Sequence, residues 1–142
     1  ITRGNNVYGQ NQYPEKVIPK FIQQLNSGKK ITIQGKGDCV RGFLHVNDTV
    51  DAFIKILEKG KIGEIYNIGG GKNIKLSNFL KILKSLSKHK INSKVDKKLL
   101  RKTDIKTQIP SAKKFFKRTH WKPEVSLKKS LEKFLNEIRS YS

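Results

Sequence analysis

TRGNNVYGQNQYPEKVIP, residues 2–19, joins a β-like opening segment to an amphipathic helix through a long polar loop. Residues 1–8 predict a strand, because Ile1, Val7 and Tyr8 stand around small polar residues. Open α/β sheets bind their ligands outside the carboxyl ends of their strands. The side chains that follow the first predicted strand therefore lie where a binding site is expected.

The spacing of apolar residues predicts a mixture of helices and strands along the rest of the chain. We expect helices over 14–26, 48–59, 77–86, 111–116 and 126–138, and further strands over 31–33, 40–46, 64–68 and 94–96. This mixture indicates an α/β or α+β fold.

The predicted helix over 48–59 has an apolar face. Its apolar residues Val50, Phe53, Ile54 and Leu57 fall on one face at helical spacing. An apolar stripe of this kind is typical of an amphipathic helix.

Length and composition favour one domain without a membrane span. The chain has 142 residues, and no apolar run approaches the roughly 20 residues that a membrane-spanning helix needs. The single Cys39 cannot form an internal disulfide, which fits a reducing compartment and predicts a cytoplasmic location. His45, His89 and His120 lack metal-ligand spacing with one another or with Cys39, so no metal site is predicted.

The net charge of +20 raises the question of nucleic-acid binding. Most of the cations are Lys and are dispersed from Lys16 to Lys133, whereas base and phosphate readout favours the planar Arg fork. We therefore interpret them as a solvated surface that binds polyanions weakly and non-specifically. A basic nucleic-acid-binding module remains an alternative, although no array of stacking aromatic residues is present.

Residues 2–19 closely resemble a signature of the nucleotide-sugar 4,6-dehydratases, which belong to the extended short-chain dehydrogenase/reductase superfamily. Arg41–Asp48 and Tyr66–Gly69 are similar to further motifs of that superfamily. The resemblance implies an α/β fold in which residues 1–142 form the C-terminal, substrate-binding portion. Residues 1–9 and 64–70 are then strands of an incomplete Rossmann sheet, and the NAD-binding and catalytic half is expected to be absent.

The resemblance also implies a nucleotide-diphosphate sugar as the ligand. In the family, the first Asn of the Asn5-Asn6 pair typically faces the sugar nucleotide and the second lies near the nicotinamide of NAD. Asn6 is therefore the expected cofactor contact, although the two roles stay open to exchange by one residue. Arg guanidinium groups can grip diphosphate oxygens in pairs. The substrate-binding residues implied in this way are Asn5, Lys16, Val17, Thr32, Ile33, Gln34, Arg41 and Arg101.

The resembled enzymes convert a glucose nucleotide to a 4-keto-6-deoxy sugar, using NAD and a Tyr-x-x-x-Lys pair. None of Tyr8, Tyr13, Tyr66 and Tyr141 has a Lys four positions later, so we expect this chain to be inactive alone. An epimerase, a reductase or a GDP-mannose dehydratase of the same superfamily stays open, as does a non-catalytic sugar-nucleotide-binding remnant. A homodimer of the complete enzyme is a further expected partner.

Overall fold

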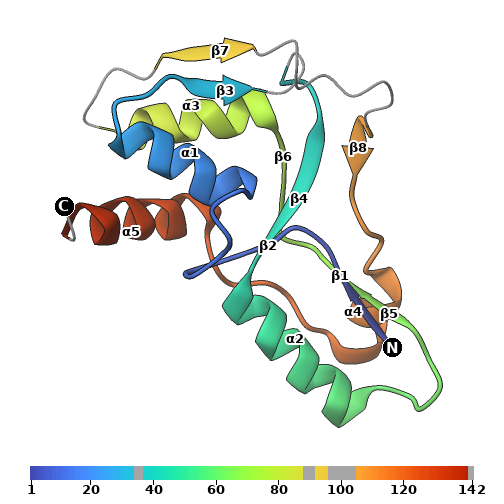
Figure 1. Ribbon diagram of the computed structural model, residues 1–142. Helices are drawn as coiled ribbons and strands as arrows, with labels where there is room; N and C mark the ends of the chain where they lie inside the picture. The colour runs from blue at the N-terminus through green and yellow to red at the C-terminus, as the bar shows by residue number, and fades with distance from the viewer. Residues whose placement is uncertain (34–36, 88–91, 96–104, 141–142) are drawn as a thin grey trace.

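A computed structural model of the chain describes residues 1–33, 37–87, 92–95 and 105–140 (Figure 1). The predicted site residues Gln34 and Arg101 lie outside the described residues. The described part contains short strands and helices, and the predicted α/β class is confirmed. None of its helices is long and apolar enough to cross a membrane.

Five helices are described: α1 (Val17–Asn26), α2 (Val46–Lys59), α3 (Leu76–Leu86), α4 (Lys113–Thr119) and α5 (Leu127–Ser140). The strands are β1 (Thr2–Gly4), β2 (Val7–Tyr8), β3 (Ile31–Ile33), β4 (Val40–His45), β5 (Tyr66–Ile68), β6 (Lys72–Lys75), β7 (Ser93–Val95) and β8 (Thr107–Gln108). The strands form small sheets with mostly parallel pairing. β1 pairs with β5, β3 with β7, and β4 with β2, β8 and, antiparallel, β6.

The opening segment is two strands, so the prediction of a single strand over 1–8 is wrong. β1 pairs with β5, whereas β2 pairs with β4 in a different sheet. The switch falls at Asn5-Asn6, where Asn6 has a φ of 48°. Asn tolerates this left-handed conformation better than most residues, which allows the chain to change sheets within two residues.

The upper part of the molecule, built from α1, α3 and α5 with β3, β4 and β6, holds the larger core (Figure 1). The helical faces predicted from periodicity are buried here as expected, since Phe21, Phe79 and Leu131 are almost fully enclosed. Phe79 lies between Phe21 and Phe43, with ring centroids 6.3 Å and 5.5 Å away. This core holds β2 and the start of α1 in place.

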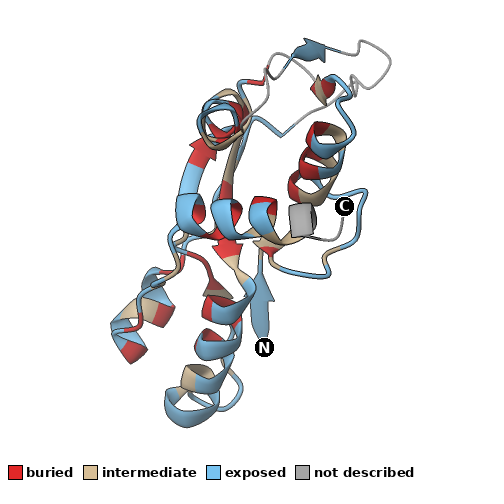
Figure 2. Ribbon diagram, turned by 90° about the vertical axis from the view of Figure 1, so that its left-hand side faces the viewer, coloured by how far each residue is buried: buried red, intermediate tan, exposed pale blue. Residues whose placement is uncertain are grey.

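The lower part, built from β1, β5, α2 and α4, has a smaller core around Tyr66, Ile68, Phe115 and Trp121. β1 is exposed along its whole length (Figure 2). Within the described residues, β1 and β5 pair only with each other. Purely parallel sheets are normally covered on both faces, so the lower part is unusually open.

The apolar face predicted for the helix over 48–59 is not buried by the described residues. Val50, Phe53, Ile54 and Leu57 are exposed, and α2 instead buries Asp48, Thr49 and Ala52. The buried side is held by polar contacts: the Asp48 carboxylate accepts the backbone N–H groups of Glu124 and Val125. The helical period was therefore predicted correctly, but no described element covers its apolar face.

Several element ends differ from the predictions. α1 begins at Val17 and not at Pro14, because Pro14–Lys16 form a turn. α2 is capped by His45, whose Nδ1 accepts the N–H of Asn47, and not by Asn47-Asp48. β6 and β8 were not predicted. Gly69–Gly71 lead into β6, and a Cβ at Gly71 would overlap the carbonyl of Phe43, so Gly71 allows close packing against β4.

Candidate functional site

The candidate site lies where β2, the following loop and the start of α1 meet. A cavity of about 300 Å³ opens there. Its lining comprises Asn6, Val7, Tyr8, Gln12, Lys16, Val17, Ile18 and Phe43. Three residues predicted from the sequence, Asn6, Lys16 and Val17, are thus brought together on one cavity.

Two amides in the cavity wall carry buried polar atoms without a hydrogen-bond partner. These atoms are Nδ2 of Asn6 and Oε1 of Gln12. The other end of the Gln12 amide is occupied, because its Nε2 donates to the carbonyl of Val7 at 2.8 Å. Buried polar groups are nearly always paired in folded proteins. The two atoms are therefore available to a polar ligand.

Lys16 adds a positive charge at the start of α1. It is the N-cap residue of the helix, and its exposed side chain makes no capping hydrogen bond. The first turn of α1 contains no acidic residue. The partial positive charge of a helix N-terminus attracts anions, and the Lys16 ammonium strengthens that attraction. This end of the cavity is suited to phosphate.

The other predicted residues lie outside the cavity wall. Asn5 precedes Asn6 at the switch between the sheets. Ile33 is buried in the upper core, and Thr32 beside it exchanges hydrogen bonds with the Gln24 amide. Arg41 lies on β4 and donates through Nη1 to the carbonyl of Ile105 at 2.7 Å. The structure therefore does not bring these side chains to the described cavity.

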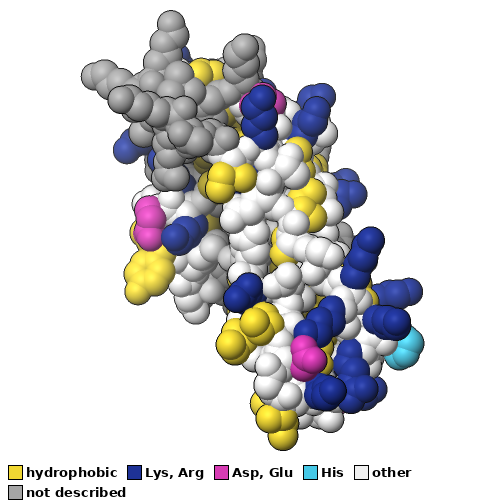
Figure 3. Space-filling view, turned by 90° about the vertical axis from the view of Figure 1, so that its right-hand side faces the viewer, with side chains coloured by type: hydrophobic (Ala, Val, Ile, Leu, Met, Phe, Trp, Pro, Cys, Tyr) yellow, Lys and Arg dark blue, Asp and Glu magenta, His cyan; other side chains and the backbone are white. Residues whose placement is uncertain are grey.

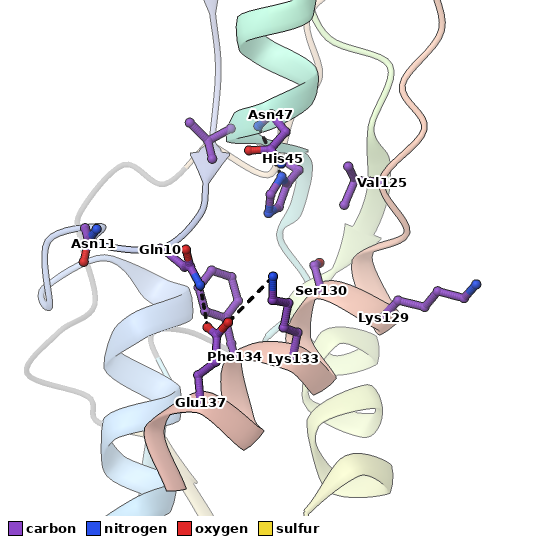
Figure 4. Close-up of a pocket in the computed structure, with 11 residues that line it drawn as sticks. Gln10, Asn11, His45, Asn47, Val125, Lys129, Ser130, Lys133, Phe134 and Glu137 are labelled. Carbon is purple, nitrogen blue, oxygen red and sulfur yellow. Dashed lines mark hydrogen bonds and ion pairs between the residues drawn. The ribbon is translucent and has the colours of Figure 1, made fainter. Parts of the chain in front are cut away.

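A second cavity of about 490 Å³ lies beside the first, between the loop after β2 and α5 (Figure 4). Gln10 donates to the Glu137 carboxylate at 2.6 Å, and the Lys133 ammonium lies 3.7 Å from the same group. Burial lowers the pKa of His45, with Lys133 acting in the same direction and Asp48 opposing. Lys133 and Glu137 in this wall are thus paired with each other.

Tyr8 stands between the two cavities as a structural contact. Its hydroxyl is hydrogen-bonded to Ser130 Oγ at 2.7 Å, and Ser130 in turn donates to the carbonyl of Leu127. Burial raises the pKa of Tyr8, which keeps the phenol neutral. Tyr8 therefore connects β2 to α5. The polar groups of the smaller cavity are suited to binding a ligand and not to reacting with it.

Gln12 is the site residue that sequence reasoning missed. It lies inside the quoted stretch, but nothing in its spacing distinguishes it from Gln10 or Asn11. Its role depends on its hydrogen bond to Val7 five residues earlier. Among the residues that the structure describes, no group of three or more His, Cys, Asp or Glu side chains could hold a metal ion.

Residues 1–69 match the NAD dependent epimerase/dehydratase family. Human dTDP-D-glucose 4,6-dehydratase is 59% identical over 69 residues, which are 49% of this chain and 20% of that protein. The match thus spans about a fifth of the curated relative's length.

Solved structures extend the similarity to almost the whole chain. The dTDP-glucose 4,6-dehydratase of Bacillus anthracis, in complex with NAD, matches 98% of this chain and 44% of its own, with 30% identity and a TM-score of 0.82. The UDP-glucuronic acid 4-epimerase of Bacillus cereus, in complex with UDP-glucuronic acid and NAD, matches 99% and 45%, with 26% identity and a TM-score of 0.86. Residues 1–69 are therefore similar to the NAD-dependent epimerase/dehydratase family, and the chain has the fold of the corresponding part of the matched nucleotide-sugar 4,6-dehydratase and epimerase structures.

Proposed function

We propose that this chain binds a nucleotide-diphosphate sugar, as the substrate-binding part of an NAD-dependent nucleotide-sugar 4,6-dehydratase. The observation that carries the proposal is the cavity that joins the unpartnered Nδ2 of Asn6 to Lys16 at the N-terminus of α1. The amide suits a sugar or phosphate oxygen. The helix end with its Lys suits the diphosphate.

Asn6 is better placed for the sugar nucleotide than for the cofactor, because its Nδ2 atom lines the same cavity as Lys16. We therefore assign Asn6 to the substrate and Asn5 to the nicotinamide side. The remaining nucleotide contacts proposed are Val17, Thr32, Ile33, Gln34, Arg41 and Arg101. A ligand at Thr32, Ile33 and Arg41 would extend beyond the described cavity, along β3 and β4, whereas Gln34 and Arg101 lie outside the described residues.

NAD in the complete enzyme would take a hydride from the sugar and later return it. The part of the chain that the structure describes offers little of the cradle that a dinucleotide needs. Gly69–Gly71 open onto β6 and not onto a helix, whereas a dinucleotide-binding turn leads into a helix N-terminus. The proposed contribution of this chain is to bind and orient the sugar nucleotide, with Asn5 at the edge of the nicotinamide site.

We also propose what covers the lower part of the molecule. β1 and β5, which lie within residues 1–9 and 64–70, would be strands of a larger parallel sheet, and the apolar face of α2 would pack against the same body. The solved relatives carry more than half of their chains outside the matched part. The occupant we assign is the NAD-binding half of this fold, whether it is part of the same polypeptide or a separate chain.

A dehydratase is favoured over an epimerase by the 59% identity over 69 residues to the human dTDP-D-glucose 4,6-dehydratase. The fold alone does not separate the two, since epimerase and dehydratase structures match equally well. The discriminating test is the product formed when the chain is combined with an NAD-binding half. A 4-keto-6-deoxy sugar supports the dehydratase, whereas a sugar inverted at one carbon supports the epimerase.

Binding itself is tested by titration calorimetry of the 142-residue chain with dTDP-glucose. We expect Lys16→Gln to weaken binding about three- to tenfold, as for the loss of one exposed charged contact. Lys20→Gln is the matched control, because it removes the same charge one helical turn later and outside the cavity lining. Absence of binding, or equal losses in the two variants, would overturn the proposal, since equal losses indicate general attraction of anions to a basic surface.

A further inference from the structure

Gln12 presents an acceptor to the ligand in a fixed orientation. Its Nε2 donates to the carbonyl oxygen of Val7 at 2.8 Å. A carbonyl oxygen can only accept, so the nitrogen of the amide must face Val7. The Oε1 atom is thereby directed away from Val7, and it lies buried without a partner.

Asn6 supplies the complementary atom in the same cavity. Its Nδ2 is a buried donor that also lacks a partner. Because neither atom has a hydrogen bond, the two amides do not bond to each other. A donor and an acceptor without partners in one small cavity can both be satisfied by a ligand group that accepts one hydrogen bond and donates another.

We propose that Asn6 and Gln12 together recognise a hydroxyl group of the sugar ring, with Gln12 as the specificity-determining residue. The hydroxyl oxygen accepts from Nδ2 of Asn6, and its proton is donated to Oε1 of Gln12. A keto or deoxy position cannot donate, so the pair selects a hydroxylated ring. This assignment rests on the proposed function, and it places the sugar on the Gln12 side of Lys16.

The first experiment compares dTDP with dTDP-glucose by titration calorimetry on three forms of the full chain. We expect the unaltered chain to bind dTDP-glucose more tightly than dTDP. Gln12→Met keeps the side-chain length and removes the acceptor, so the affinity for dTDP-glucose should fall about tenfold while that for dTDP changes less than about twofold. Gln10→Met is the matched control, because Gln10 bonds to Glu137 outside this cavity.

The second experiment leaves the protein intact and deletes single hydroxyls from the ligand. One monodeoxy analogue of dTDP-glucose should lose at least the same factor as Gln12→Met, because it also loses the hydrogen bond from Asn6. Combining that analogue with the variant should then cost nothing further, as a double-mutant cycle requires for two partners of one contact. Independent, additive losses would overturn the assignment.

The outcomes separate this inference from the proposed function. Equal affinities for dTDP and dTDP-glucose in the unaltered chain overturn the role of Gln12 and leave nucleotide binding standing. Equal losses for both ligands in Gln12→Met also overturn it, because Gln12 would then only hold the loop against Val7. Binding of neither ligand overturns the proposed function and this assignment with it.

Discussion

The upper and lower parts of the molecule use similar amphipathic helices in different ways. In the upper part, the apolar faces of α1, α3 and α5 meet one another around Phe79 and Leu131. In the lower part, α2 has an apolar face of comparable pattern, but Leu57 on it is 85% exposed and Ile62 in the following turn is fully exposed. Figure 3 shows hydrophobic side chains at the surface of the lower end, among Lys and Arg. The upper part is complete as a core, whereas the lower part has the form of one side of an interface.

The largest expected difference between the two parts comes from the same substitution made in each. Leu83 is fully buried in α3, and Leu57 is mostly exposed in α2. Leu83→Ala should lower the free energy of unfolding by about 2–5 kcal/mol, and Leu57→Ala by less than about 0.5 kcal/mol. Urea unfolding of the 142-residue chain measures both. Similar losses in the two variants would mean that α2 is already covered.

The contact that joins the two parts should give the next largest effect. The buried Asp48 carboxylate of α2 accepts N–H groups from the segment that leads into α5. Asp48→Ala leaves those donors unpaired and should cost about 1–3 kcal/mol in urea unfolding. Asp38, which is exposed, is the matched control. An equally small cost at both positions would show that the parts are not held together by this carboxylate.

The exposed face of α2 should also make the isolated chain self-associate, as unpaired sheet edges and apolar patches commonly do. We expect the double variant Phe53→Gln and Leu57→Gln to weaken self-association about tenfold, or about 1.4 kcal/mol. Sedimentation velocity over a range of concentrations measures this. Val95→Gln is the control, because Val95 is exposed in the upper part. If the unaltered chain sediments as a monomer at every concentration, that result would contradict the expectation.

The smallest effect concerns pH at the cap of α2. Burial lowers the pKa of His45 in the folded chain, so between the folded and unfolded pKa values the unfolded state binds more protons. The stability contributed by neutral His45 is therefore present above its unfolded pKa of about 6.5 and is lost as pH falls through the folded value. His45→Asn keeps a capping acceptor without this titration. Its unfolding free energy should depend less on pH between about 7 and 5, and an unchanged slope would assign that dependence to other groups.

These differences explain which features could be predicted from the sequence. The inward faces of α1, α3 and α5 were predicted because their partners lie within the chain. The periodicity of α2 was also read correctly, but periodicity shows which face is apolar and not what covers it. β6 and β8 were missed because Lys72–Lys75 and Thr107–Gln108 lack an apolar alternation. Their pairing with β4 is a tertiary effect.

The candidate site was predictable to a similar degree. The resemblance of residues 2–19 implied Lys16 and Val17 as substrate contacts and Asn6 as a cofactor contact, and the structure puts all three on one cavity. Gln12 was missed because its importance comes from a local hydrogen bond that fixes its amide and from the burial of its oxygen. Neither property is visible in residue type or spacing.

The change of sheet at Asn5-Asn6 has a mechanical consequence. Only two residues separate β1, on the exposed edge of the lower part, from β2, in the wall of the cavity. A two-residue linker allows little independent movement, so a protein domain that binds β1 also constrains the backbone of Asn6. The affinity of the cavity for its ligand and the affinity of that domain for β1 are then linked in both directions by the same coupling free energy. The affinity of the cavity for its ligand would therefore change when β1 is bound by such a domain.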